Sequence, residues 1–140
     1  MGGAPLDVEE FQRWRDGAAD ALASARREAA AGAHNWSCFL AEQSAQLAFK
    51  ALLHGLGRGP WGHDLIRLGR DTEDAGVEVP PDLKDALARL ARHYIPARYP
   101  DAHPAGSVSA RYRASDSAAA IADAQQALDF IDASWRSLGG

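Results

Sequence analysis

The sequence predicts an all-α protein that folds as an antiparallel, up-and-down bundle of four to five helices. Alanine, the residue with the highest intrinsic helix propensity, dominates the composition. Apolar residues recur every three or four positions over most of the chain, which is the period of an amphipathic helix. The only alternating, strand-like stretch covers positions 77–79 and is followed at once by two prolines. Because most links between the helical segments are short, consecutive helices are expected to run antiparallel.

Length and composition predict one globular domain over residues 1–140. The chain is 46% hydrophobic and 24% charged, which is ordinary for a globular protein, and its length is enough for one core. No apolar run approaches the roughly 20 residues of a membrane-spanning helix, and no secretory signal is visible, so no membrane association is expected. The single cysteine, Cys38, cannot form an internal disulfide, which agrees with the reducing cytoplasm.

The first helix is predicted from its capping pattern. Asp7 suits an N-cap with Glu10 three residues later, and Leu6 is placed to form a hydrophobic staple with Phe11. The predicted core face is Phe11, Trp14, Ala18, Leu22 and Ala25, with Gly32 as the stop.

The second helix is predicted from about Asn35 to His54. Its predicted apolar face consists of Trp36, Phe39, Leu40, Leu47 and Ala51. Gln43, Gln46 and Lys50 lie on or beside that face. Two interpretations follow: these polar groups line a cleft or a dimer contact, or they mark the edge of the buried stripe with Lys50 extending to solvent.

Three more helices are expected in the second half of the chain. A short one begins near His63 with Asp64 as its cap, another begins at Pro80-Pro81 and ends before Pro96, and the last begins with Ser115 as its cap. The apolar positions are Leu65, Ile66 and Leu68 in the third helix, Leu83, Leu87, Leu90 and Tyr94 in the fourth, and Ile121, Ala124, Leu128, Ile131, Trp135 and Leu138 in the last.

A basic segment lies within this acidic chain. The net charge is −4, yet positions 89–113 hold five arginines and one acidic residue, a local balance of +4. The arginines are Arg89, Arg92, Arg98, Arg111 and Arg113, and the acid is Asp101. Positions 95–114 contain several prolines and no helical pattern, and loops of this length inside a small domain are often functional. The segment is therefore a candidate site for phosphate or another anion.

The stretch from Arg92 to His103 combines the groups that RNA chemistry uses. Guanidinium groups bind phosphate, aromatic rings stack on bases, and imidazoles titrate near neutral pH. In RNA cleavage without a metal, a histidine such as His103 moves the proton of the 2′-hydroxyl or of the leaving oxygen, and an arginine such as Arg98 stabilises the phosphorane charge. The alternative is a proline-rich surface loop whose tyrosines plug the bundle end and whose Arg98 pairs with a carboxylate.

Metal and cofactor sites are not expected. The five histidines are scattered, and none forms a His-x-x-x-His pair on a helix. No glycine-rich loop follows a strand, so the phosphate-binding fingerprints of nucleotide-binding α/β folds are absent.

Four groups of residues occur in an order that is typical of one family. They are Trp14 with Ala18, Asp20 and Ala25; positions 38–53; His63-Asp64-Leu65; and Tyr94 with Arg98-Tyr99-Pro100-Asp101. In this order they resemble the first helix, the signature second helix, the His-Asp-Leu element and the Tyr…Arg-Tyr-Pro-Asp segment of the HEPN domain family. Gln46 stands where the family usually has a glutamate. The resemblance implies a helical bundle that commonly forms a homodimer.

The resemblance also implies function. Many members pair with a minimal nucleotidyltransferase as toxin–antitoxin systems, and active members are metal-independent ribonucleases with an arginine followed four to six residues later by a histidine. Here these catalytic residues would be Arg98 and His103, although Tyr99 and Pro100 replace the helical, polar continuation usual in the family. The expected RNA- or nucleotide-binding residues are Arg92, His93, Tyr99, Lys50, His63 and Arg111. The alternative is a non-catalytic nucleotide-binding or interaction subunit.

Overall fold

The computed structural model describes residues 5–140, which form five α-helices, two short 3-10 helices and no strand. The α-helices are α1 (Val8–Ala30), α2 (His34–Gly55), α3 (Leu65–Asp74), α4 (Pro81–Ala91) and α5 (Ala114–Ser137), and the 3-10 helices are η1 (Pro100–Ala102) and η2 (Ser109–Arg111). The predicted all-α bundle is therefore confirmed. None of the helices in this described part combines the length and apolar character that a membrane span requires.

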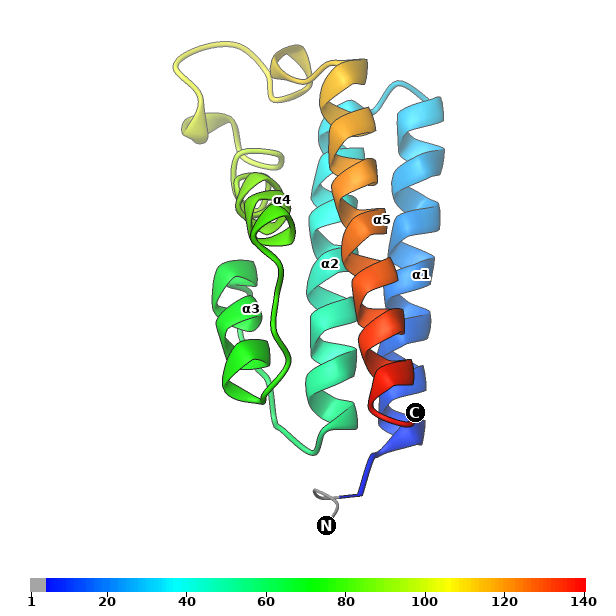
Figure 1. Ribbon diagram of the computed structural model, residues 1–140. Helices are drawn as coiled ribbons and strands as arrows, with labels where there is room; N and C mark the ends of the chain where they lie inside the picture. Colours follow the sequence, from blue (N-terminus) through cyan, green and yellow to red (C-terminus); the bar gives the residue numbers. More distant parts are fainter. Residues whose placement is uncertain (1–4) are drawn as a thin grey trace.

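The long helices α1, α2 and α5 lie side by side, and the shorter α3 and α4 cover the other side of α2 (Figure 1). Helix α1 leads away from the end where the C-terminus lies, α2 returns to it, α4 leads away again and α5 returns. The connection from α4 to α5 crosses the far end of the bundle. This connection, residues 92–113, contains the basic segment, so the fold displays that segment at one end.

The capping predictions are confirmed for two helices and wrong for one. The Asp7 carboxylate accepts a hydrogen bond from the Glu10 amide at 3.0 Å, and Asp64 accepts from the first amides of α3 at 3.1 and 3.2 Å. Helix α5, however, begins at Ala114, before the predicted cap Ser115. The Asp116 carboxylate accepts instead from the Arg113 amide at 2.8 Å, because an acid in the first turn can reach back over the helix start.

The predicted apolar face of α2 is wrong. Of its five residues only Ala51 is buried, and Trp36 is 46% exposed. Helix α2 contacts α1, α3, α4 and α5, so small residues that allow close approach form most of its buried surface, and several large ones lie outside. The buried hydrophobic residues of α2 are Cys38, Ala41, Ala45, Ala48, Phe49, Ala51, Leu52 and Leu53.

Two serines of α2 show how closely the helices approach. The Ser37 hydroxyl donates to the Ala25 carbonyl of α1 at 2.7 Å, and the Ser44 hydroxyl donates to the Ala18 carbonyl at 2.7 Å. Each buried hydroxyl is thereby satisfied by the neighbouring backbone, which a longer side chain would push away.

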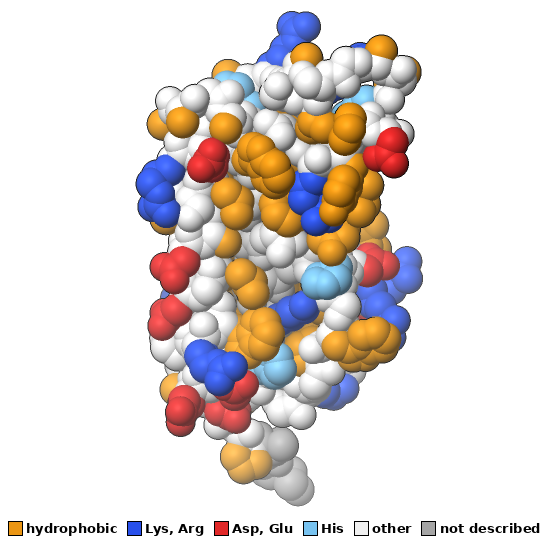
Figure 2. Space-filling model, turned by 180° about the vertical axis from the view of Figure 1, so that it is seen from behind, with side chains coloured by type: hydrophobic (Ala, Val, Ile, Leu, Met, Phe, Trp, Pro, Cys, Tyr) orange, Lys and Arg blue, Asp and Glu red, His pale blue; other side chains and the backbone are white. Residues whose placement is uncertain are grey.

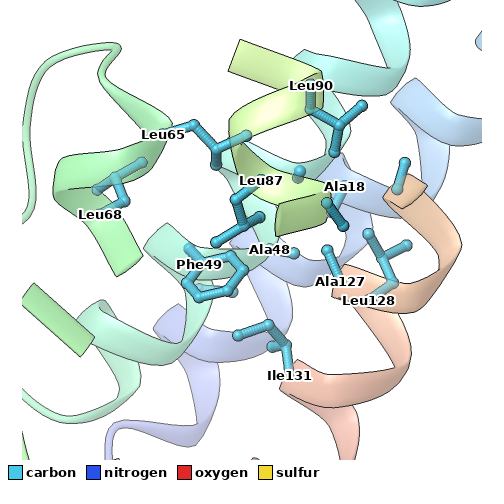
Figure 3. Packing of buried hydrophobic residues seen from close by; sticks show 14 of the residues in the cluster. Ala18, Ala48, Phe49, Leu65, Leu68, Leu87, Leu90, Ala127, Leu128 and Ile131 are labelled. Atoms are coloured by element: carbon cyan, nitrogen blue, oxygen red, sulfur yellow. The ribbon is translucent and has the colours of Figure 1, made fainter. Parts of the chain in front are cut away.

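The core lies between all five α-helices and is filled mainly by alanines and leucines, with Phe49 among them (Figure 3). The predicted stripe of α4 is buried except for Tyr94, which lies beyond the helix and is half-buried. In α5 the predicted positions 124, 128, 131 and 135 are buried, whereas Leu138 is 41% exposed. The Trp135 ring stacks on Phe11 of α1 at 4.1 Å between ring centroids, which closes the other end of the bundle.

The connection from α4 to α5 is held to the bundle at definite points. Ala97 and Val108 are buried, and the buried Asn35 amide of α2 donates to the Ala97 carbonyl at 3.0 Å. Its two 3-10 helices are too short to change the prediction that the segment lacks a regular helix. Because Asn35 fixes the backbone beside Arg98, the placement of that arginine depends on α2.

Candidate functional site

Arg98 lies among three aromatic rings, a cluster that we term the arginine cage. Its guanidinium carbon is 4.5 Å from the ring centroids of Phe39 and Tyr94 and 4.9 Å from that of Tyr99. The Arg98 Nε donates to the Tyr94 carbonyl at 2.8 Å. Stacking on several rings and one backbone hydrogen bond restrict the guanidinium to a narrow range of orientations.

The guanidinium of the cage keeps donors for another ligand. Across residues 5–140, Arg98 forms no ion pair with a carboxylate, so the alternative in which it pairs with an acid is wrong. Its terminal Nη groups are not used by the Nε bond to Tyr94. Tyr99 is 47% exposed, so its ring is accessible beside these donors.

A buried carboxyl that the sequence interpretation missed lies next to the cage. Glu42 of α2 is fully buried and accepts hydrogen bonds from the side-chain amides of Gln43 at 2.9 Å and Gln46 at 2.6 Å. Burial raises the pKa of Glu42 from 4.5 to about 7, while the two amides and the charges of Arg98 and Lys50 lower it. This carboxyl therefore changes its charge near neutral pH.

Gln46 connects that carboxyl to the start of α3. The same Nε2 that donates to Glu42 also donates to the His63 carbonyl at 3.0 Å, and Gln46 is only 2% exposed. Gln46 therefore belongs to an internal hydrogen-bond network. Both sequence interpretations, a residue that lines a cleft or dimer contact and a residue at the edge of the buried stripe, are wrong for Gln46. Glu42, the carboxyl that Gln46 contacts, lies one helical turn earlier in α2. The sequence signal was an acid and an amide four residues apart, a spacing that places them on one side of a helix.

His63 and Arg92 border an open depression of about 590 Å³ between the start of α3 and the end of α4. The His63 ring stacks on Tyr94 at 5.4 Å with an angle of 17° between the rings. Tyr94 thus contacts both His63 and Arg98, and it joins the depression to the arginine cage. Asp64 both caps α3 and lines this depression.

His103 has a different set of contacts. Its Nε2 lies 2.6 Å from the Pro96 carbonyl, and its ring meets the edge of Tyr112 at 6.3 Å. The His93 Nδ1 lies 3.3 Å from the Tyr112 hydroxyl, and burial lowers the pKa of His93 and raises that of Tyr112 to about 12. None of these contacts involves a residue that holds Arg98, so the described residues of one chain form two adjacent clusters.

The remaining predicted binding residues are dispersed. Lys50 is half-buried on α2, where burial lowers its pKa and the charge of Glu42 raises it. Arg111 is exposed and donates through Nε and Nη2 to the Ala105 carbonyl at 3.0 and 2.6 Å, which folds the connection on itself. Arg89 forms an ion pair with Asp123 at 3.0 Å, so the basic segment is less positive than its composition indicates.

The face opposite the view of Figure 1 shows how these groups reach the surface. Hydrophobic side chains gather on its upper half around a basic group, and further basic and histidine side chains continue down its middle (Figure 2). The exposed large hydrophobic residues of the molecule include Trp36, Ile95 and Tyr99, which belong to or flank the cage and the depression. Cationic and hydrophobic side chains are therefore interleaved on this face.

The fold and the site define an all-α bundle with a basic, aromatic connection displayed at one end. The chain belongs to the HEPN domain family, whose model matches residues 11–134. The family is associated in general with nucleotide binding, with ribonucleases and with dimers.

Solved structures agree with the family. The fold is similar to that of TT1696 from Thermus thermophilus, with a TM-score of 0.83 and 38% identity over 87% of this chain and 95% of that one. It is similar to ST0689, an archaeal HEPN homologue, with a TM-score of 0.74 and 28% identity over 89% and 96%. A HEPN domain protein from Thermotoga maritima gives a TM-score of 0.71 and 26% identity over 89% and 98%. No curated protein matches significantly.

Proposed function

We propose that this HEPN-domain protein binds RNA or nucleotides through Arg98, acts as a homodimer, and forms the HEPN half of a toxin–antitoxin-type pair with a minimal nucleotidyltransferase. The observation that supports binding is the arginine cage. Three rings and a carbonyl orient the guanidinium, and no carboxylate of the described chain forms an ion pair with it. An oriented guanidinium beside an exposed tyrosine can hold a phosphate while the ring stacks on a base.

The catalytic form of the proposal is a metal-independent endoribonuclease. Since the Pro96 carbonyl can only accept, its 2.6 Å contact with His103 requires a proton on Nε2 and leaves Nδ1 of the neutral ring as a base. In this proposal Nδ1 takes the proton of a 2′-hydroxyl as that oxygen attacks the adjacent phosphorus, and Arg98 stabilises the charge on the phosphorane. The bond from phosphorus to the 5′-oxygen then breaks, the leaving oxygen takes the proton back from His103, and a 2′,3′-cyclic phosphate remains. A phosphate that reaches both residues must span the two clusters, within one chain or across a dimer.

The non-catalytic alternative rests on the separation of those clusters. His103 is engaged with the backbone of its own loop, and Tyr99 and Pro100 replace the polar helical residues usual in the family motif. A binding subunit would need Arg98 and its rings but not His103.

Binding and cleavage by single variants separate these two forms. Arg98→Ala should weaken RNA binding about 10- to 100-fold, because hydrogen bonds to a charged group are lost. Arg136→Ala removes the same charge from an exposed position at the end of α5 and should leave binding unchanged. If His103→Ala abolishes RNA cleavage and retains RNA binding, the catalytic form of the proposal holds. Equal binding by wild type and Arg98→Ala would refute both forms.

The partner is tested separately. The chain would be co-expressed with the nucleotidyltransferase encoded nearest to it, and their copurification and its effect on growth arrest would be measured. A stable complex that relieves toxicity supports the toxin–antitoxin pair, whereas the absence of any complex contradicts it. Light scattering of the purified protein at several concentrations tests the homodimer.

A further inference from the structure

The depression between α3 and α4 is built mainly from apolar side chains. His63, Asp64 and Leu65 line it from the start of α3, and Ala91, Arg92, Tyr94, Ile95 and Pro96 line it from the end of α4 and the residues that follow. Ile95 is 46% exposed, which is a large apolar surface to leave open to water. The volume of about 590 Å³ is within the range of small-molecule sites.

We propose that this depression is a subsite for a purine base, whose phosphate lies toward Arg92 and the arginine cage. The inference rests on the proposed function, because it assigns the base of the nucleotide that Arg98 helps to bind. The depression itself is not needed for Arg98 to bind a phosphate.

The lining offers an imidazole ring and apolar side chains to a flat ligand. The exposed His63 ring is backed by the stacked Tyr94 ring, which also contacts Arg98, and Leu65, Ile95 and Pro96 add apolar surface beside it. A base gains from such surfaces through stacking and through loss of water. A purine covers more of this lining than a pyrimidine does, so the depression favours the larger base.

The charges around the depression determine which way the phosphate of a bound nucleotide points. Arg92 lies on the α4 side and forms no ion pair within the described chain, whereas the Asp64 carboxylate lies on the α3 side. Asp64 already accepts from the amides of Ile66 and Arg67, so the start of α3 offers those donors to its own cap rather than to a phosphate. A phosphate is therefore repelled from α3 and attracted to Arg92.

Tyr94 makes the two subsites continuous. It lines the depression, and its ring lies 4.5 Å from the guanidinium carbon of Arg98. A ligand with its base in the depression thus has one unpaired arginine on the α4 side and a second across a single side chain.

Calorimetry with GMP, AMP, UMP and ribose 5-phosphate tests the base subsite. Wild type should bind the purine nucleotides at least about 10-fold more tightly than ribose 5-phosphate, and UMP should fall between them. Ala91→Phe fills the depression and should reduce purine affinity to that of ribose 5-phosphate without changing the latter. Arg92→Ala should weaken all four ligands, because each carries the phosphate.

Two further measurements distinguish a lost binding surface from a misfolded variant. Ile95→Ser alters an exposed wall residue, so it should lower purine affinity several-fold in a protein that melts like wild type. Circular dichroism checks the fold of Ala91→Phe. Equal affinities for ribose 5-phosphate and the purine nucleotides, or a purine preference that survives Ala91→Phe, would overturn the base subsite. No binding of any of the four ligands to wild type would overturn the nucleotide-binding function itself.

Discussion

The side-chain amide of Gln46 donates a 2.6 Å hydrogen bond to the buried carboxyl of Glu42, and both residues lie inside α2. The same amide reaches the His63 carbonyl at 3.0 Å, so it joins the carboxyl to the wall of the depression. Because burial raises the pKa of Glu42 to about 7, this network contains a charge that depends on pH in the physiological range. Its protonation state therefore affects both the stability of the bundle and the electrostatics of the arginine cage.

Glu42 should make the protein less stable as pH rises from about 4.5 to about 7. In this window the folded carboxyl binds more protons than the unfolded one, so the free energy of unfolding falls with increasing pH. Its contribution is fully present below 4.5 and lost above about 7, and the full change is on the order of 3 kcal/mol. Urea unfolding of wild type and Glu42→Gln at pH 5 and pH 8 measures the difference.

Glu42→Gln should lose this pH dependence and keep the fold. Gln43 can rotate its amide to present an oxygen to the new side chain, while Gln46 continues to donate to the remaining oxygen and to His63. Glu42→Ala, in contrast, leaves a cavity and unpaired amides and should cost about 2–4 kcal/mol at both pH values. A pH profile that is identical in wild type and Glu42→Gln would contradict the titration of Glu42 in this range.

Arg98→Ala should raise the pKa of Glu42 further. The Arg98 charge favours the ionised carboxyl, and its removal leaves burial opposed only by the two amides and Lys50. Carbon-13 NMR of the Glu42 carboxyl, titrated in both proteins, measures the shift directly. Arg136→Ala should leave this titration unchanged, since that exposed arginine is not among the groups that affect Glu42. A lower Glu42 pKa in Arg98→Ala would show that the guanidinium does not act on the buried carboxyl.

Gly55→Ala should destabilise the bundle by about 1–3 kcal/mol, as overpacking does. A Cβ at Gly55 would lie 2.5 and 2.7 Å from two ring atoms of Trp135 and 3.1 Å from the Cβ of Phe11. That Trp135 ring is held in a 4.1 Å stack on Phe11, so it cannot move away without losing the stack. Thermal and urea unfolding of the purified variant measure the cost.

Gly17→Ala is the matched control for that substitution. The nearest atom to its added Cβ is Leu47 Cδ1 at 3.7 Å, an ordinary contact, and Gly17 lies inside α1. The gain in helix propensity should therefore stabilise the protein by about 0.5–1 kcal/mol. Similar effects from the two substitutions would show that the contact between Gly55 and Trp135 does not determine the packing.

Apolar periodicity identified most of the buried positions of α4 and α5 and failed for α2. Helices α4 and α5 present one stripe to the core, so the predicted positions 83, 87 and 90 and positions 124, 128, 131 and 135 are buried. Helix α2 has neighbours on almost every side, and its alanines and serines pack where a periodicity argument looks for large residues. The aromatic Trp36 and Phe39 therefore belong to the surface and the cage rather than the core.

The candidate site was predictable in composition but not in arrangement. Arg98, Tyr99, His63 and Arg92 were named from residue chemistry and family resemblance, and they lie around Tyr94 or beside it. Glu42 was missed because a helical pattern does not reveal that a carboxyl is buried. The path of the loop was also beyond the sequence, since it depends on the long-range hydrogen bond from Asn35 to the Ala97 carbonyl.

The start of α5 offers a direct comparison between the sequence prediction and the structure. Asp116→Ala should destabilise the protein by about 1 kcal/mol, because its carboxylate accepts from the Arg113 amide at 2.8 Å and places negative charge at the helix start. Ser115→Ala should change stability by less than about 0.5 kcal/mol, since that serine is exposed and lies inside the helix. Urea unfolding at pH 7 compares the two variants. Should the serine substitution prove the more costly, Ser115 caps α5 in solution and the helix begins at Asp116, two residues later than described.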